Sequence, residues 1–200
     1  MLRINNLVGF GASLANEALF IGATGESTAT SVTWPAGTAE GDIALIFSVG
    51  TGSLTGSGLT HMTSTPISGS SARTSWKVLT AGDVSSFTVT VPTYGFYMIL
   101  VFRGPTTATL KSNAASTGAS ASVSGFTKAA GSQFIVSAGF DRDPSTLDYV
   151  TSWEQGAQGQ GSYFGMTTSW LASADYDETG WTQDLTASSY QGCYNAIELT

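Results

Sequence analysis

Residues 34–104 decide the fold, because they carry two apolar runs separated by repeated turn signals. The stretch opens with Trp34-Pro-Ala-Gly-Thr-Ala-Glu-Gly-Asp42, passes through an apolar run, and reaches Trp76-Lys-Val-Leu-Thr-Ala-Gly-Asp83. A second apolar run, Phe96-Tyr-Met-Ile-Leu-Val-Phe-Arg-Gly104, closes it. The Gly-Asp pairs at 41–42 and 82–83 each open into a β-branched or aromatic run, which is the punctuation of β-hairpins. The stretch therefore predicts antiparallel strands, and no residue in it indicates catalysis.

Strand-like patterns also occur outside this stretch. Alternating or continuous apolar residues predict strands at residues 19–23, 28–34, 42–49, 59–64, 73–79, 86–91, 96–103, 108–111, 133–140, 149–153, 163–172 and 193–199. This pattern predicts an all-β fold, an antiparallel β-sandwich. Residues 43–47 and 96–102 are apolar on both faces, so their outer face requires cover by a loop, a terminal arm or another subunit.

The length and composition favour one domain. A chain of 200 residues with 42% hydrophobic content can bury a full core. We assign residues 13–200 to a single β-sandwich domain and residues 1–12 to an N-terminal arm or edge strand. The arm's candidate assembly contacts are its apolar side chains: Leu2, Ile4, Leu7, Val8 and Phe10. The similarity of residues 38–42 to 79–83 is explained by shared turn chemistry better than by a duplication.

Charge excludes several classes of partner. The net charge is −7 and the chain holds only seven Lys and Arg residues, so we expect no nucleic acid as a partner. No apolar run approaches the roughly 20 residues of a membrane-spanning helix, and an acidic chain has little attraction to anionic lipid surfaces. Charged residues make up 10% of the chain against about 25% in typical soluble domains, which suits tightly packed assemblies.

Cysteine and histidine are nearly absent. Cys193 is the only cysteine and His61 the only histidine, so neither an intramolecular disulfide nor a zinc site of the usual ligands can form within one chain. We expect no cofactor. Calcium is the one metal that the residue types allow, through Asp141, Asp143 and Asp148 or through Asp175, Asp177 and Glu178. Neither group follows the pattern of the twelve-residue calcium loop, so both are better explained as solvated acidic loops. In the first group, Arg142 neutralises the neighbouring aspartates.

The turn and strand residues quoted above resemble those of small bacteriophage β-sandwich proteins of the decoration or tail-appendage type. The similarity covers residues 32–104, with the spacing of its proline-alanine-glycine, glycine-aspartate, tryptophan and arginine-glycine elements, and the closing run Tyr194-Asn-Ala-Ile-Glu-Leu199. The resemblance implies a jelly-roll-like antiparallel β-sandwich on the outer surface of a virus particle, without recognised catalytic residues. Residues 105–191 match nothing in that pattern.

Two hypotheses from different classes follow, with an enzyme as a third. The first is a non-enzymatic virion structural protein, a capsid decoration or cement protein or a short appendage subunit. It would contact other virion proteins and itself form a homo-oligomer, with a trimer as one expected form. The alternative is a tail-associated receptor- or carbohydrate-binding module that uses the aromatic residues Trp153, Tyr163 and Trp181. A hydrolase would require two of four carboxylates to face each other: Asp143, Glu154, Asp175 and Asp184.

Overall fold

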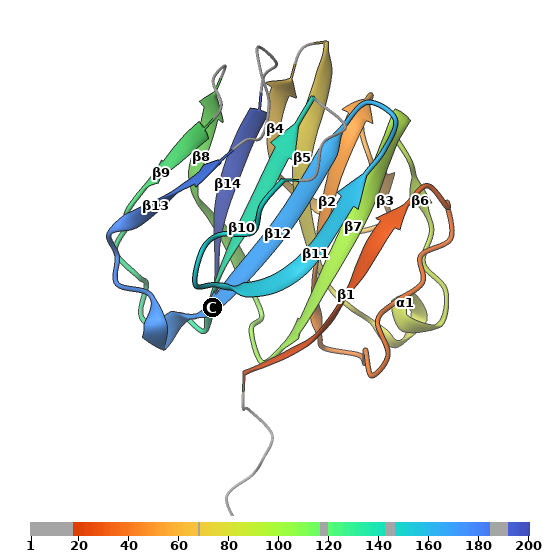
Figure 1. Cartoon of the computed structure of the whole chain (residues 1–200). Coiled ribbons are helices and arrows are strands. Elements are labelled where there is room, and N and C mark those ends of the chain that lie inside the picture. Colours follow the sequence, from red (N-terminus) through yellow and green to blue (C-terminus); the bar gives the residue numbers. More distant parts are fainter. Residues whose placement is uncertain (1–17, 68, 117–119, 143–146, 185–191) are drawn as a thin grey trace, which may run out of the picture.

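The computed structural model describes residues 18–67, 69–116, 120–142, 147–184 and 192–200. Two five-stranded antiparallel sheets face each other and form a β-sandwich (Figure 1). The antiparallel all-β sandwich predicted from the sequence is confirmed. Within these ranges, no helix has the length and apolar character needed to cross a membrane.

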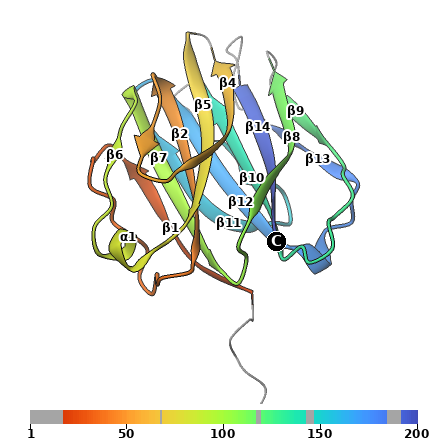
Figure 2. The same cartoon turned by 180° about the vertical axis from the view of Figure 1, so that it is seen from behind.

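Each sheet is built from one half of the chain. The first sheet has the order β1 (Leu19–Ser27), β7 (Thr93–Arg103), β2 (Ile43–Thr51), β5 (Ser70–Val78) and β4 (Thr60–Ile67). The second has the order β11 (Glu154–Gln160), β12 (Gly165–Ala172), β10 (Phe134–Asp141), β14 (Gly192–Leu199) and β8 (Ala108–Ser116). The chain passes from one sheet to the other once, between β7 and β8 (Figure 2).

Shorter elements lie outside the two large sheets. They are the strand pairs β3 (Thr55–Gly56) with β6 (Val89–Thr90) and β9 (Ser120–Ser124) with β13 (Gly180–Asp184), the helix α1 (Ala81–Ser85) and the 3-10 helix η1 (Ser173–Asp175). Val89 of β6 and Val84 of α1 pack against the first sheet. The β9–β13 pair lies beside β8 and β14 of the second sheet.

The main core lies between the sheets. Alternate residues of the central strands point inward and are buried, as the period of two requires: Ile43, Leu45, Phe47 and Val49 from β2, Phe96, Met98, Leu100 and Phe102 from β7, and Phe134, Val136, Ala138 and Phe140 from β10. Burial of each of the larger side chains stabilises the fold by about 1.5–3 kcal/mol. This core joins the two halves of the chain.

The two halves share one strand order. In each half the first long strand pairs with the last, the last with the second, the second with the fourth, and the fourth with the third. The same turn precedes each central strand: Gly41 and Gly131 have φ of 86° and 83°. The amide N–H groups of Asp42 and Ser132, one residue later, each donate to an alanine carbonyl three residues back, at 3.2 Å. Glycine is favoured there because L side chains rarely adopt this φ.

The repeated topology reveals a repeat in the sequence. Thr74-Ser75-Trp76 in β5 and Thr168-Ser169-Trp170 in β12 are identical triplets, and both tryptophans lie opposite the third residue of the central strand. Tyr97 in β7 and Tyr194 in β14 are likewise equivalent, and both are fully buried on the outer face of their sheet. The repeat therefore relates the two halves. The stretches 38–42 and 79–83, which resemble each other, both lie in the first half.

The first sheet's outer face is covered by the chain itself. Ile46, Tyr97, Ile99 and Val101 pack against a second buried cluster supplied by surrounding segments, which includes Val32, Leu54, Leu79, Phe87 and Val89. The sequence left three possible covers for this face: a loop, a terminal arm or another subunit. The structure shows that loop segments of the chain itself cover it. These strands accordingly give no support to a covering subunit.

The charged residues of the turn motif hold this cover in place. Asp42 is almost completely buried and accepts hydrogen bonds from Arg103 Nε (2.8 Å) and Nη2 (2.9 Å). Lys77 pairs with Asp83 at 2.6 Å, and Asp83 also forms a capping box with Thr80 at the start of α1. The Gly-Asp and Arg-Gly signature is thus explained by structural ion pairs.

Several local predictions need correction. Residues 28–34 form no strand, only an isolated bridge between Ser31 and Thr88, because Val32 and Trp34 cover the sheet instead of extending it. Residues 149–153 form a loop that precedes β11. The second Gly-Asp pair lies inside α1 and not in a hairpin turn. The arm and all its candidate contacts (Leu2, Ile4, Leu7, Val8 and Phe10) fall outside the described residues.

Candidate functional site

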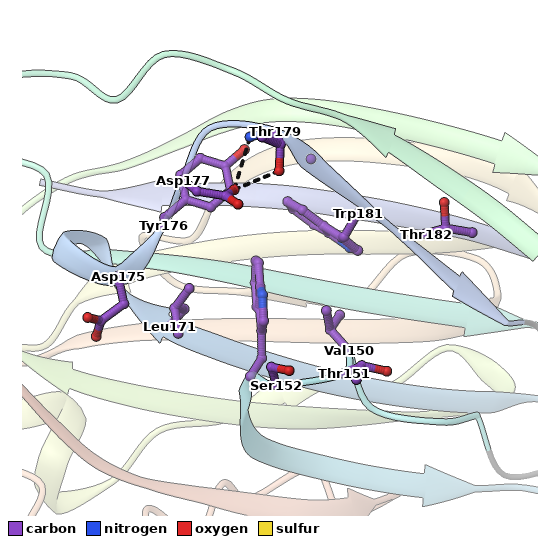
Figure 3. A pocket seen from close by; sticks show the side chains of 12 residues that line it. Val150, Thr151, Ser152, Leu171, Asp175, Tyr176, Asp177, Thr179, Trp181 and Thr182 are labelled. Carbon is purple, nitrogen blue, oxygen red and sulfur yellow. Dashed lines mark hydrogen bonds between the residues drawn. The ribbon is translucent and has the colours of Figure 1, made fainter.

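A hollow of about 410 Å³ lies on the outer side of the second sheet (Figure 3). The loop before β11, strand β12, helix η1 and strand β13 line it. Its lining combines aromatic rings, hydroxyl groups and carboxylates: Val150, Thr151, Ser152, Trp153, Leu171, Asp175, Tyr176, Asp177, Thr179, Gly180, Trp181 and Thr182. We call it the aromatic hollow.

Three rings form its apolar part. The rings of Trp153 and Trp181 lie 4.6 Å apart between centroids and are tilted by 52°. Tyr176 meets both edge-on, at 6.4 Å and 6.3 Å, and packs on Phe126 at 4.9 Å on another side. Trp153 and Trp181 are partly exposed while Tyr176 is buried, so the two indoles offer surface to a ligand and the phenol supports them.

Carboxylates and hydroxyls surround these rings. Asp177 accepts hydrogen bonds from the Thr179 hydroxyl (2.7 Å) and amide (3.1 Å), which lower the pKa of its carboxyl and keep it ionised. Asp175 is exposed at the rim. Burial raises the pKa of Tyr176, whose hydroxyl stays neutral and accepts a hydrogen bond from the Phe126 amide at 3.3 Å. The hollow therefore offers acceptors to a ligand rich in hydroxyl groups.

The wall of the aromatic hollow is held rigidly by the neighbouring segment 125–128. Lys128 Nζ donates to the carbonyl oxygens of Ser173 and Tyr176, both at 2.8 Å. The Gly125 Cα lies so close to the segment that contains Glu178 that a Cβ on Gly125 would be 2.0 Å from the Glu178 carbonyl oxygen. These contacts fix η1 and the turn that follows it.

Backbone strain gathers at this site. Among the described residues, three that are not glycine have positive φ: Tyr94 (56°), Ser152 (70°) and Glu178 (66°). Ser152 lines the hollow and Glu178 lies between two residues that line it. Such conformations cost about 1–3 kcal/mol each and cluster at ligand sites.

The first half provides an internal comparison. Lys77 and Leu171 occupy equivalent positions, each opposite the second residue of its central strand. In the first half Lys77 Nζ contacts the Phe87 ring at 4.9 Å and binds the carbonyl of Ser57 at 2.8 Å, so that space is filled. In the second half Leu171 leaves the corresponding region open. The hollow is therefore a local departure from a shared framework.

The structure unites two of the three aromatic residues predicted as ligand-facing. Trp153 and Trp181 line the aromatic hollow, whereas Tyr163 lies in another surface hollow beside Tyr94. Tyr176 and Phe126 support the site through contacts between segments far apart in the sequence. The one signal that pointed toward them was the concentration of aromatic residues after residue 126.

The candidate metal and catalytic carboxylates that the structure describes form no metal-binding group. Within the ranges that the structure describes, no group of three His, Cys, Asp or Glu residues is arranged to hold a metal ion. Glu154 and Asp175 are exposed and Asp141 is buried, while Asp143 and the side chain of Asp184 lie outside the described part. His61 is exposed in β4 and its Nδ1 lies 2.8 Å from the Ser75 hydroxyl oxygen.

Comparison of the chain with protein-family models, with curated proteins and with solved structures finds no match.

Proposed function

We propose that this protein is a non-enzymatic carbohydrate-binding module carried on the outer surface of a bacteriophage particle. The observation that carries the binding role is the aromatic hollow, where the partly exposed rings of Trp153 and Trp181 lie 4.6 Å apart beside ionised and hydroxyl acceptors. The setting on a phage particle is supported only by the sequence resemblance of residues 32–104 and 194–199.

The chemistry of the hollow favours a neutral sugar over other ligands. The C–H face of a pyranose packs on an indole ring, and its hydroxyl groups can donate to the carboxylates of Asp175 and Asp177. The same carboxylates repel phosphate and nucleic acid. We assign no catalytic role to Glu154 and Asp175, because both are exposed and a general acid for glycoside hydrolysis needs an apolar surround.

The test is calorimetry with a panel of neutral oligosaccharides of glucose, galactose, mannose and N-acetylglucosamine. We expect at least one to bind, and Trp153→Ala and Trp181→Ala each to weaken its binding about tenfold, which corresponds to about 1.4 kcal/mol of lost ring contact. Leu19→Ala is the matched control, because Leu19 is an exposed apolar residue outside the hollow.

Two results would refute the proposal. One is that no sugar of the panel binds to the folded protein. The other is that both tryptophan variants, with unfolding midpoints like that of the wild type, bind as well as the wild type. Release of reducing sugar from a bound oligosaccharide would contradict the non-enzymatic part.

Attachment to the particle as a structural subunit is a second candidate function. It is favoured by the apolar residues of the predicted arm, including Leu2, Ile4 and Leu7, and by the low fraction of charged residues in the chain. A truncation that lacks residues 1–12 should still fold but lose attachment to particles and any homo-oligomer that the arm makes. Attachment equal to that of the full chain would reject this role for the arm.

A further inference from the structure

A second site lies where the first residues of β7 meet the turn between β11 and β12, at the upper right of Figure 1. Leu19, Tyr94 and Tyr163 are the large apolar side chains that stand exposed in the described ranges, and the two tyrosines touch each other. Their ring centroids are 6.0 Å apart at an interplanar angle of 78°. Two exposed rings in contact form a surface that solvent alone does not favour.

The backbone forces Tyr94 outward. Its φ of 56° is strained for a bulky residue, and its side chain is 74% exposed. The next residue must be glycine, because a Cβ on Gly95 would lie 1.8 Å from the Val49 carbonyl oxygen. The β2–β7 register shifts nearby, between Val49 and Thr51, and such bulges re-aim side chains beside binding sites.

Arg142 gives this site its charge. Its guanidinium carbon lies 5.3 Å from the ring centroid of Tyr163 and 4.8 Å from that of Phe164, and Nη1 donates to the Tyr163 carbonyl at 2.8 Å. That bond uses one of the five N–H donors of the guanidinium. The sequence interpretation, in which this arginine neutralises neighbouring aspartates, misses its contacts with the two rings.

A hollow of about 170 Å³ opens beside these groups. Its lining, among the described residues, is Thr51, Ser70, Tyr94, Arg142, Tyr163 and Phe164, which supply one cation, several hydroxyl groups and no carboxylate. Its volume falls below the 300–1,000 Å³ of pockets for larger ligands and suits a single ring. In a chain with a net charge of −7, a hollow with only a positive group selects for an anion.

We propose that this hollow binds one carboxylate-bearing sugar residue, such as a hexuronic acid at the end of an acidic polysaccharide. The carboxylate pairs with the planar guanidinium of Arg142, the sugar ring packs on Tyr94, and sugar hydroxyl groups reach Thr51 and Ser70. The site shares no residue with the aromatic hollow and does not depend on the function proposed for it.

The test is an NMR titration of the ¹⁵N-labelled full chain with methyl β-glucuronide, with methyl β-glucoside and with acetate. We expect glucuronide to shift the amides of Tyr94, Gly95 and Tyr163, and the other two probes to bind at this hollow at least about tenfold more weakly. Arg142→Gln should weaken glucuronide binding at least about tenfold, and Arg142→Lys should weaken it less, since lysine keeps the charge and loses the planar fork.

Trp153→Ala is the matched control and should leave glucuronide binding unchanged. The proposal fails if glucuronide does not bind, if glucoside or acetate binds at this hollow as tightly, or if Arg142→Gln binds glucuronide like the wild type. It also fails if the shifted amides are those of the aromatic hollow. Arg142 is partly exposed, so we expect both Arg142 variants to stay folded. An unfolding midpoint close to that of the wild type will show that they do.

Discussion

Replacing Arg103 with methionine should destabilise the protein strongly for a surface residue. The Asp42 side chain is only 1% exposed and accepts three hydrogen bonds, two from Arg103 and one from the Ala39 amide at 2.8 Å. Arg103→Met leaves this carboxylate with the amide alone and also removes the bond from Nη2 to the Gly37 carbonyl. Breaking a fully buried pair costs about 3–5 kcal/mol.

The expected loss is smaller than that limit, because the Arg103 side chain is 44% exposed and water can reach the vacated site. We expect the free energy of unfolding to fall by about 2–3 kcal/mol and the thermal midpoint to fall by about 5–10 °C. Urea unfolding followed by tryptophan fluorescence measures the change. Glu40→Gln, an exposed carboxylate in the same turn, should stay within about 0.5 kcal/mol of the wild type.

A double-mutant cycle isolates the pair. Asp42→Asn removes the charge that Arg103 compensates, so a protein that already carries this change should lose less stability when Arg103→Met is added. We expect the two changes together to cost about 1–2 kcal/mol less than their sum. If Arg103→Met costs under about 0.5 kcal/mol, or if the two changes simply add, the ion pair does not hold the cover on the first sheet.

Two more predictions concern titratable groups. Burial opposes ionisation of Asp83 and Glu198, but hydrogen bonds from Lys77 and Thr80 to the first, and from the Ala129 amide and Lys111 to the second, lower both carboxyl pKa values. The unfolded chain therefore binds these protons first, and stability should fall as the pH drops below about 4; urea midpoints in Asp83→Asn and Glu198→Gln should decline less steeply. Burial raises the pKa of the Cys193 thiol to about 12, so a thiol reagent at about pH 8 should label the protein only after denaturation, and fast labelling of the native state would contradict its burial.

Strand patterns predicted the central strands well. Residues 43–47 of β2, 96–102 of β7 and 134–136 of β10 form continuous apolar runs, and all of them are buried, so residue type and burial agree there. Residues 154–160 read Glu-Gln-Gly-Ala-Gln-Gly-Gln and carry no such signal, yet they form the edge strand β11 through pairing with β12. Polar edge strands are specified by their neighbours and not by their own pattern.

The candidate sites required contacts that the sequence does not display. Trp153 and Trp181 lie 28 positions apart by their numbers and meet because η1 and β13 fold over the second sheet. Tyr94 carries no signal of its own in the sequence, since its positive φ and its exposure depend on the register of β2 with β7. The identical triplets at residues 74–76 and 168–170 were visible in the sequence, but only the shared strand order gives them meaning.

The single crossing between β7 and β8 makes the main core an interface between two consecutive segments of chain. In this respect the molecule resembles a heterodimer whose partners are joined by a short tether that keeps their effective concentration high. Each partner presents its inner face to the other and carries its own cover on the outside. The outer cover of one half can therefore diverge in sequence and acquire a binding surface without altering the contacts that hold the two halves together.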